Sequence, residues 1–258
     1  MPSPVKIKSR QSDIAALVRQ NKLMESIEAP FRNRLIREKN RYIRKAAQTA
    51  LRTRSVTDED YFEHKQQIKG ILETYYRRII RSMSQEIFAT TKGADRPIEK
   101  KFTFWEALFL DFVGTYAAKK VTRISNTTRS DVQGALRAAI EDPDVVNEAQ
   151  LTKRILATRG VSAFRASMIA RTETHAAAMY ASTNSAANIA QETGLVLKKK
   201  WIPALDERTR ISHANMIDSE AIPMDGFFDV GGERLEYPSD PNGSAGNVIN
   251  CRCVLVYE

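Results

Sequence analysis

Apolar residues recur at helical spacing over the first 90 positions of the chain. After Pro30, which suits the first turn of a helix, they advance in steps of four or seven residues as Phe31, Leu35, Tyr42, Ala46 and Ala50. A second run follows Thr57 and Asp60, which have the spacing of a capping box. Its apolar positions are Tyr61, Ile68, Leu72, Tyr75, Ile79, Met83 and Ile87, and it is predicted to end near Lys92 and Gly93. Because each run has one apolar stripe to bury, the pattern predicts two long helices paired as an antiparallel hairpin.

Helical patterns continue through the middle of the chain. The aromatic segment from Phe102 to Tyr116 predicts a buried helix over residues 103–124. Shorter helices are predicted over residues 128–140 and 147–158, with breaks at Asp142, Pro143 and Gly160. Ser162 has the character of an N-cap for an alanine-rich helix that runs to Thr193 and stops at Gly194.

The pattern changes after Gly194. Residues 195–202 are predicted to form a strand, proline, glycine and aspartate turns follow, and residues 248–257 alternate as a second strand would. The predicted fold class is therefore α+β. A long-helix region over residues 1–160 precedes a small α+β domain over residues 161–258 with a short antiparallel sheet.

Composition is that of a soluble globular protein. The chain has 258 residues, 42% of them hydrophobic, and its mean hydropathy is −0.41. No apolar run approaches the roughly 20 residues that span a bilayer, and the first residues lack a signal-peptide pattern, so we expect neither a membrane span nor secretion. Cys251 and Cys253 cannot form a disulfide framework and suit a reducing cytosol.

The net charge of +9 is concentrated near the N-terminus. Residues 1–100 hold 22 Lys and Arg against 12 Asp and Glu. The densest stretch is predicted to bind a polyanion or an acidic protein surface, and its members are Arg32, Arg34, Arg37, Lys39, Arg41, Arg44 and Lys45. The alternative is an ordinary solvated helix face.

Side chains that can carry chemistry gather in the last 90 positions. In a strand, Cys251 and Cys253 would point to the same face and present two thiols to one site, as zinc sites do. His213 is the natural third ligand, with Asp206 or His175 as the fourth. Two interpretations other than a zinc site are possible for these residues. The cysteines could be buried structural thiols with a hydrogen-bonded histidine, or a cysteine and a histidine could form a nucleophilic pair. On the preceding helix, Arg171 and Glu173 are explained most simply as structural anchors, and Trp201 as core.

The order of these residues resembles the Mu F-like head morphogenesis family of tailed phages. The resemblance spans roughly residues 162–256 and rests on an ordered set of short pieces: Arg171-Thr172-Glu173, Lys200-Trp201, Asp206 to His213, Asp225-Gly226, Phe228, Pro238 to Pro241, and Asn250 to Cys253. Within that set Arg171, Glu173, Trp201, Arg210 and Asn250 are expected to be structural. His175 falls outside the family pattern, so His213 is the better metal ligand.

The resemblance implies a minor head protein, incorporated in the procapsid beside the portal. Its implied partners are the portal, capsid or scaffold proteins and packaged DNA, and its implied location is the phage head after assembly in the host cytoplasm. No complete catalytic motif is present, so we expect no enzyme activity. The alternative is a metal-dependent nuclease or effector enzyme carried in the head. A stand-alone DNA-binding regulator is disfavoured, because the basic helix lacks helix-turn-helix spacing.

Overall fold

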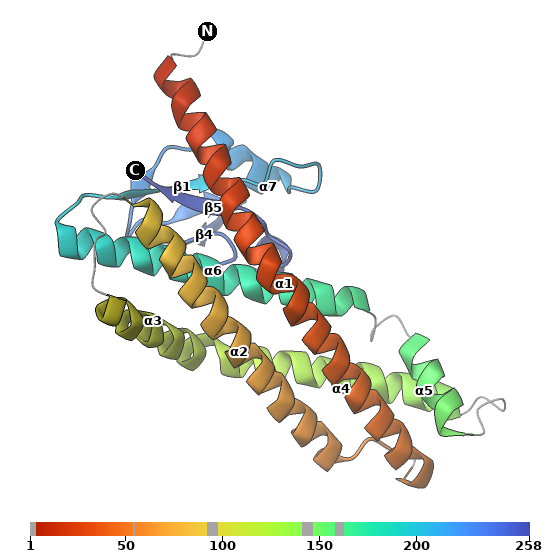
Figure 1. The fold of residues 1–258 in the computed structure, drawn as a ribbon. Helices are drawn as coiled ribbons and strands as arrows, with labels where there is room; N and C mark the ends of the chain where they lie inside the picture. The colour runs from red at the N-terminus through yellow and green to blue at the C-terminus, as the bar shows by residue number, and fades with distance from the viewer. Residues whose placement is uncertain (1–3, 54, 92–97, 141–146, 158–162) are drawn as a thin grey trace. The chain divides into compact units, whose positions relative to one another are not determined.

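A computed structural model describes residues 4–53, 55–91, 98–140, 147–157 and 163–258 (Figure 1). Helix α1 spans Pro4–Thr53 and α2 spans Asp58–Thr90. They run antiparallel, since Glu38 of α1 bonds His64 of α2 and Lys45 bonds Asp60 and Glu63. The predicted capping box is confirmed: the Asp60 amide donates to the Thr57 hydroxyl at 3.3 Å.

The prediction that a helix begins at Pro30 is wrong, because Pro30 lies inside α1. A proline in a helix interior costs about 3 kcal/mol. Buried side chains continue across it, with Met24 and Ile27 before the proline and Phe31 and Leu35 after it. Burial along this stripe offsets the cost of the missing backbone donor.

Three further helices follow: α3 (Ile98–Phe112), α4 (Ala118–Ile140) and α5 (Glu148–Ala157), with a π-helical turn η1 at Val113–Ala117 between α3 and α4. The sequence predicted separate helices over residues 103–124 and 128–140, but α4 runs continuously through residues 124–128. The hydroxyls of Thr127 and Thr128 each donate a 2.8 Å hydrogen bond to the backbone carbonyl four residues earlier. These bonds satisfy the two polar side chains within the helix. The predicted breaks at Asp142, Pro143 and Gly160 lie outside the described residues.

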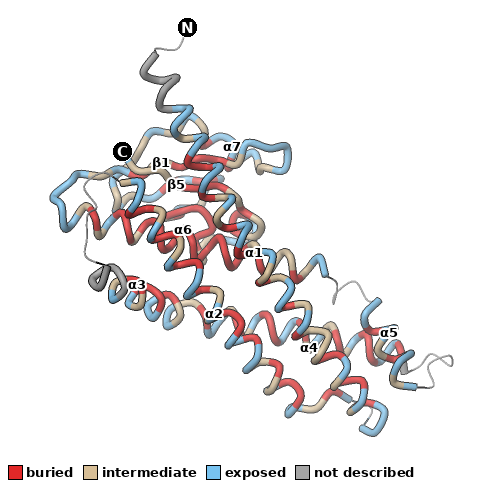
Figure 2. Tube along the Cα trace, in the orientation of Figure 1, coloured by how far each residue is buried: buried red, intermediate tan, exposed pale blue. Residues whose placement is uncertain are grey.

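Helix α6 (Ala163–Thr193) is the predicted alanine-rich helix. Every residue from Thr172 to Thr183 is buried, and much of α6 is red in Figure 2, as expected of a helix that is covered all round. Gly194 follows it with a φ of +71°, a left-handed stop that suits glycine. Ser162, the predicted N-cap, lies outside the described residues.

The C-terminal strands form two small antiparallel sheets, which confirms the α+β class. Strand β1 (Lys198–Ile202) pairs with β2 (Ile222–Pro223) and β5 (Val254–Tyr257), whereas β3 (Phe228–Val230) pairs with β4 (Glu233–Leu235). Short helices α7 (Ile211–Ala214), η3 (Asn215–Asp218) and α8 (Ala245–Val248) connect them. The strand predicted over residues 248–257 begins only at Val254, because α8 ends at Val248 and Asn250 has a φ of +59°.

Contacts divide the chain into two compact units. Unit 1 comprises Met1–Ile27, Tyr76–Phe112 and Arg171–Glu258, and unit 2 comprises Glu28–Tyr75 and Val113–Ala170. The domain boundary predicted after residue 160 therefore does not coincide with the division of the chain by its contacts. Unit 2 has its own core, formed by Tyr42, Ile43, Ala46, Ala47, Ala50, Val56, Val132, Ala135, Leu136, Ala139, Leu151 and Ile155.

The charge excess lies almost entirely in unit 2. The sequence of unit 2 holds 20 Lys and Arg against 12 Asp and Glu, a surplus of 8, whereas unit 1 holds 20 against 19. In the part of the chain that the structure describes, no helix has the length and apolar character that crossing a membrane requires.

Candidate functional site

One group of three possible metal ligands lies in unit 1, formed by His213 on α7 with Cys251 and Cys253 just before β5. All three are buried, and their ligand atoms lie within 4.8 Å of one another. The His213 Nδ1 atom is 3.4 Å from the Cys253 Sγ atom and 3.6 Å from the Cys251 Sγ atom. The predicted convergence of these three residues is therefore found, although neither cysteine lies within the strand. We call this group the Cys/His cluster.

Two hydrogen bonds and one unusual backbone conformation shape the loop that carries the cysteines. The Arg210 guanidinium donates a hydrogen bond to the Ile249 carbonyl. The backbone amide of Asn250 donates to the Thr172 hydroxyl of α6 at 3.1 Å. Asn250 also has a left-handed φ of +59°, a conformation that asparagine tolerates better than most residues. Arg210 and Asn250, expected from the family motif to be structural, thus lie where they hold the loop before Cys251.

Asn247 on α8 orients the histidine of the cluster. Its Oδ1 atom is 3.3 Å from the His213 Nε2 atom, and its Nδ2 atom donates to the Val230 carbonyl at 3.1 Å. Trp201, fully buried as expected for a core residue, packs edge-on against the His213 ring with 5.5 Å between centroids. Sequence reasoning missed Asn247, since a lone asparagine carries no pattern.

Hydrogen bonding within the cluster shifts the pKa values of the two thiols in opposite directions. Burial raises the pKa of Cys251, but hydrogen bonding with Cys253 and His213 outweighs burial and holds that pKa well below the ordinary thiol value. The hydrogen bond to Cys251 and burial raise the pKa of Cys253. The first proton of the pair is therefore lost more readily than the proton of an isolated buried thiol. This favours a Cys251 thiolate beside His213.

The structure places Asp206 on the surface and apart from the Cys/His cluster. Its carboxylate accepts two hydrogen bonds from the Arg252 guanidinium, at 2.5 and 2.9 Å, and a third from the Arg208 amide at 3.0 Å. The hydrogen bond from Arg252 lowers the pKa of Asp206. A carboxylate engaged in this way braces the loop between β1 and α7 against the cysteine loop.

The remaining motif residues and His175 lie on α6. Glu173 is buried and accepts a 2.7 Å hydrogen bond from the Tyr76 hydroxyl of α2, so it ties α6 to α2 within unit 1. His175 is buried beside the Ser239 hydroxyl, 3.4 Å from its Nδ1 atom, and its Nε2 atom has no hydrogen-bond partner. Burial lowers the pKa of His175 to about 4, which keeps the ring neutral at pH 7.

The basic residues of α1 fall into two groups in unit 2. Arg34, Arg37, Arg44 and Arg52 are exposed, at steps that keep them on one side of the helix. We call these four residues the arginine face. Arg32 and Lys39 are half-buried.

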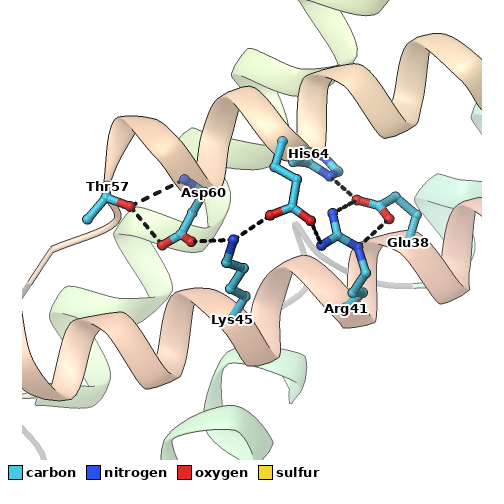
Figure 3. Close-up of polar contacts among 7 residues, drawn as sticks. Glu38, Arg41, Lys45, Thr57, Asp60 and His64 are labelled. Atoms are coloured by element: carbon cyan, nitrogen blue, oxygen red, sulfur yellow. Dashed lines mark hydrogen bonds and ion pairs between the residues drawn. The ribbon is translucent and has the colours of Figure 1, made fainter.

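Arg41 and Lys45, predicted with the others to bind DNA or portal, are engaged with α2 (Figure 3). Arg41 donates to Glu63 at 2.5 Å and to both oxygens of Glu38, at 2.8 and 2.9 Å, and Lys45 also bonds Glu63. The sequence could not separate them from the exposed arginines, because they share one helical face.

The acidic centre of this network is Glu38, which is buried. It accepts a 2.9 Å hydrogen bond from His64, whose ring is also buried and stacks on Tyr42. Burial raises the pKa of Glu38, but the hydrogen bonds from His64 and Arg41 lower it by more than burial raises it. The net pKa of Glu38 is therefore below its ordinary value. We call Glu38, Arg41, Lys45, Asp60, Glu63 and His64 the hairpin network.

Comparison with known proteins places the cluster in a known family. Residues 130–256 match the family described as phage Mu protein F like protein. The C-terminal half of the chain belongs to the phage Mu F-like family. The matched residues include the whole Cys/His cluster, Asn247 and the motif residues on α6. Membership indicates a protein of phage head morphogenesis, and the family is a structural one.

A shorter similarity links this Mu F-like chain to an enzyme. A stretch of 67 residues is 33% identical to the NAD(+)--arginine ADP-ribosyltransferase EFV of Enterococcus faecalis (strain ATCC 700802 / V583). The stretch covers 26% of this chain and 13% of that protein, so the chain spans only a small part of this relative. No solved structure matches the Mu F-like chain significantly.

Proposed function

We propose that this protein is a minor capsid protein of a tailed phage, incorporated in the procapsid near the portal. The observation that carries the proposal is the Mu F-like match over residues 130–256, which includes the buried cluster of His213, Cys251 and Cys253. Assembly takes place in the host cytoplasm, and the finished protein lies inside the head. Portal, capsid or scaffold proteins are its protein partners.

The arginine face is proposed to contact packaged DNA or the portal. Unit 2 carries a surplus of 8 positive charges, and Arg34, Arg37, Arg44 and Arg52 present part of that surplus to solvent. Guanidinium groups suit phosphate oxygens, and binding a polyanion releases its counterions. Arg41 and Lys45 are left out of this surface, because their partners are the carboxylates of the hairpin network.

Particle composition tests the proposed function directly. We expect mass spectrometry of purified mature particles to find this polypeptide in a small, fixed number of copies relative to the major capsid protein. A protein that is absent from both procapsids and mature particles would not be a head component. Its presence in procapsids alone would make it an assembly factor that is shed.

Charge reversal tests the arginine face. The triple variant Arg34→Glu, Arg37→Glu and Arg44→Glu is expected to lose incorporation into particles while its thermal unfolding is unchanged. If DNA is the partner, the log of its association constant should depend less steeply on the log of the salt concentration. The magnitude of that slope should decrease by up to about 3, since each phosphate contact contributes about 0.9.

The matched control removes three exposed cations of unit 1 with the same change in net charge: Arg10→Glu, Arg78→Glu and Lys198→Glu. It should keep both incorporation and the salt dependence. Equal losses in the two triple variants would mean that net charge, and not the arginine face, governs binding. Normal incorporation of the arginine-face variant would exclude the face as a contact.

The competing function is a metal-dependent nuclease or effector enzyme, to which the match with an ADP-ribosyltransferase gives some support. Burial of the Cys/His cluster supports a structural role instead, because its residues have relative exposures of only 1–2%. A polymeric substrate has no access to such a group. Two thiols and an imidazole are ligands that zinc prefers, so we propose zinc as the ion. Because the cluster is buried, we expect no turnover.

A further inference from the structure

The geometry points to a zinc centre whose protein ligands are the His213 Nδ1 atom and the two thiolates of Cys251 and Cys253, with Asn247 as the residue that positions His213. This inference rests on the structural role proposed for the Cys/His cluster and goes beyond it by naming the coordinating atoms and the positioning residue. It does not depend on the partner of the arginine face.

The distances between the ligand atoms are those of a tetrahedral zinc site. Zinc bonds of about 2.3 Å to sulfur and 2.0–2.1 Å to nitrogen, at a tetrahedral angle, place nitrogen and sulfur roughly 3.6 Å apart. The observed distances from Nδ1 are 3.4 Å to Cys253 and 3.6 Å to Cys251. A single ring nitrogen has one proton or one lone pair, so it cannot hydrogen-bond both thiols well. One metal ion between the three atoms satisfies all of them.

Asn247 selects the histidine tautomer that binds metal. Because its Nδ2 group donates to the Val230 carbonyl at 3.1 Å, its Oδ1 atom is the one that faces His213. An amide oxygen accepts a hydrogen bond, so the proton of the neutral ring sits on Nε2. The lone pair then lies on Nδ1, directed at the two sulfur atoms. Hydrogen bonds of this kind to the second ring nitrogen are the rule for histidine ligands.

Neither residue considered from the sequence as a fourth ligand lies in the Cys/His cluster. Asp206 is held at the surface by Arg252. His175 is buried, but the ligand atoms that lie within 4.8 Å of one another are those of His213, Cys251 and Cys253. We therefore assign these three residues as the protein ligands and assign no side chain to the fourth position.

Metal analysis of the full-length protein tests the centre. We expect one zinc per chain after purification without added metal. A strong chelator should lower the melting temperature, and zinc but not magnesium should restore it. No bound zinc together with a melting curve that chelator and added zinc leave unchanged would overturn the centre.

Variants separate the roles of the residues, with zinc affinity measured by chelator competition. Cys253→Ser and His213→Ala should lose the metal, whereas Met216→Leu, a buried substitution on the neighbouring helix η3, should keep it. Asn247→Leu should lower zinc affinity about 10–100-fold with one zinc still bound at saturation, and Asn247→Asp should restore most of the affinity. Unchanged affinity in Asn247→Leu would overturn the positioning role.

One further result completes the test. In the nitrogen NMR spectrum of the zinc-loaded protein, His213 should coordinate through Nδ1, and coordination through Nε2 would overturn the assignment. Particle incorporation of the wild-type protein reports separately on the proposed head function, so failure of one proposal does not imply failure of the other.

Discussion

Residues 161–258, expressed alone, are expected not to unfold cooperatively, although they hold most of the Mu F-like match. The reason is that the C-terminal strands and α6 complete their packing with N-terminal segments of unit 1. The Gln20 side chain donates a buried 2.9 Å hydrogen bond to the Leu255 carbonyl of β5, and Lys200 of β1 pairs with Asp13 at 2.8 Å. Without α1, these groups and the apolar surface around them would face water.

Helices α2 and α3 supply a second set of contacts. Tyr76 bonds Glu173 at 2.7 Å, and Phe112 packs against Tyr180 with 5.1 Å between ring centroids. The measurement is thermal unfolding followed by near-ultraviolet circular dichroism, for the fragment and for the full chain as control. Adding residues 1–112 as a separate chain should restore part of the cooperative transition. A sharp transition in the isolated fragment would show that these contacts are dispensable.

The second large effect is expected from Glu38→Ala in the hairpin network. The substitution leaves Arg41 with one carboxylate partner fewer and leaves the buried His64 without the acceptor of its Nδ1 group. Removing one partner of a buried, hydrogen-bonded charge network costs about 3–5 kcal/mol of unfolding free energy. Urea unfolding measures the loss. Glu73→Ala is the matched control, because Glu73 pairs with Lys69 on the exposed side of α2 and should cost less than about 0.5 kcal/mol.

The pH dependence gives an independent check on Glu38. Its folded pKa lies below its ordinary value of 4.5, so its stabilising contribution is fully present above about pH 4.5. As the pH falls below that value the unfolded state takes up the proton first, and the contribution is lost as the pH passes through the lowered folded pKa. Glu38→Gln should therefore lose less stability than the wild type over this acidic range. Parallel pH profiles for the two proteins would contradict a charged Glu38 in the folded state.

Local patterns in the sequence predicted much of the helical fold. The Thr57 and Asp60 box and the stop at Gly194 depend on interactions within a few residues, and both are found as predicted. Pro30 was misjudged because the apolar stripe on both sides of it is stabilised by distant segments. The strand predicted from residue 248 onwards failed for a related reason: alternation cannot show that Asn250 adopts a left-handed backbone conformation.

The candidate site was predictable in part. The types and spacing of Cys251, Cys253 and His213 sufficed to propose one site, because the C-terminal region has no other cysteine and only one other histidine. Asp206 could not be placed from the sequence, since its partner Arg252 lies 46 residues away. Arg41 and Lys45 resemble their exposed neighbours until the opposing helix supplies Glu63. Whether such a charged side chain is exposed or paired depends on a partner from another element. The sequence of its own helix or loop does not reveal that partner.

The contact between Gln20 and Leu255 joins residues 235 positions apart, which has a consequence for the order of folding. During translation the N-terminal half of α1 leaves the ribosome long before β5 has been made. Unit 2 uses only residues 28–75 and 113–170, so it can become compact while synthesis continues. Unit 1 must wait for the last strand, and its high contact order makes it the slower unit to form. Until then, the exposed apolar side of α1 is a natural substrate for chaperones.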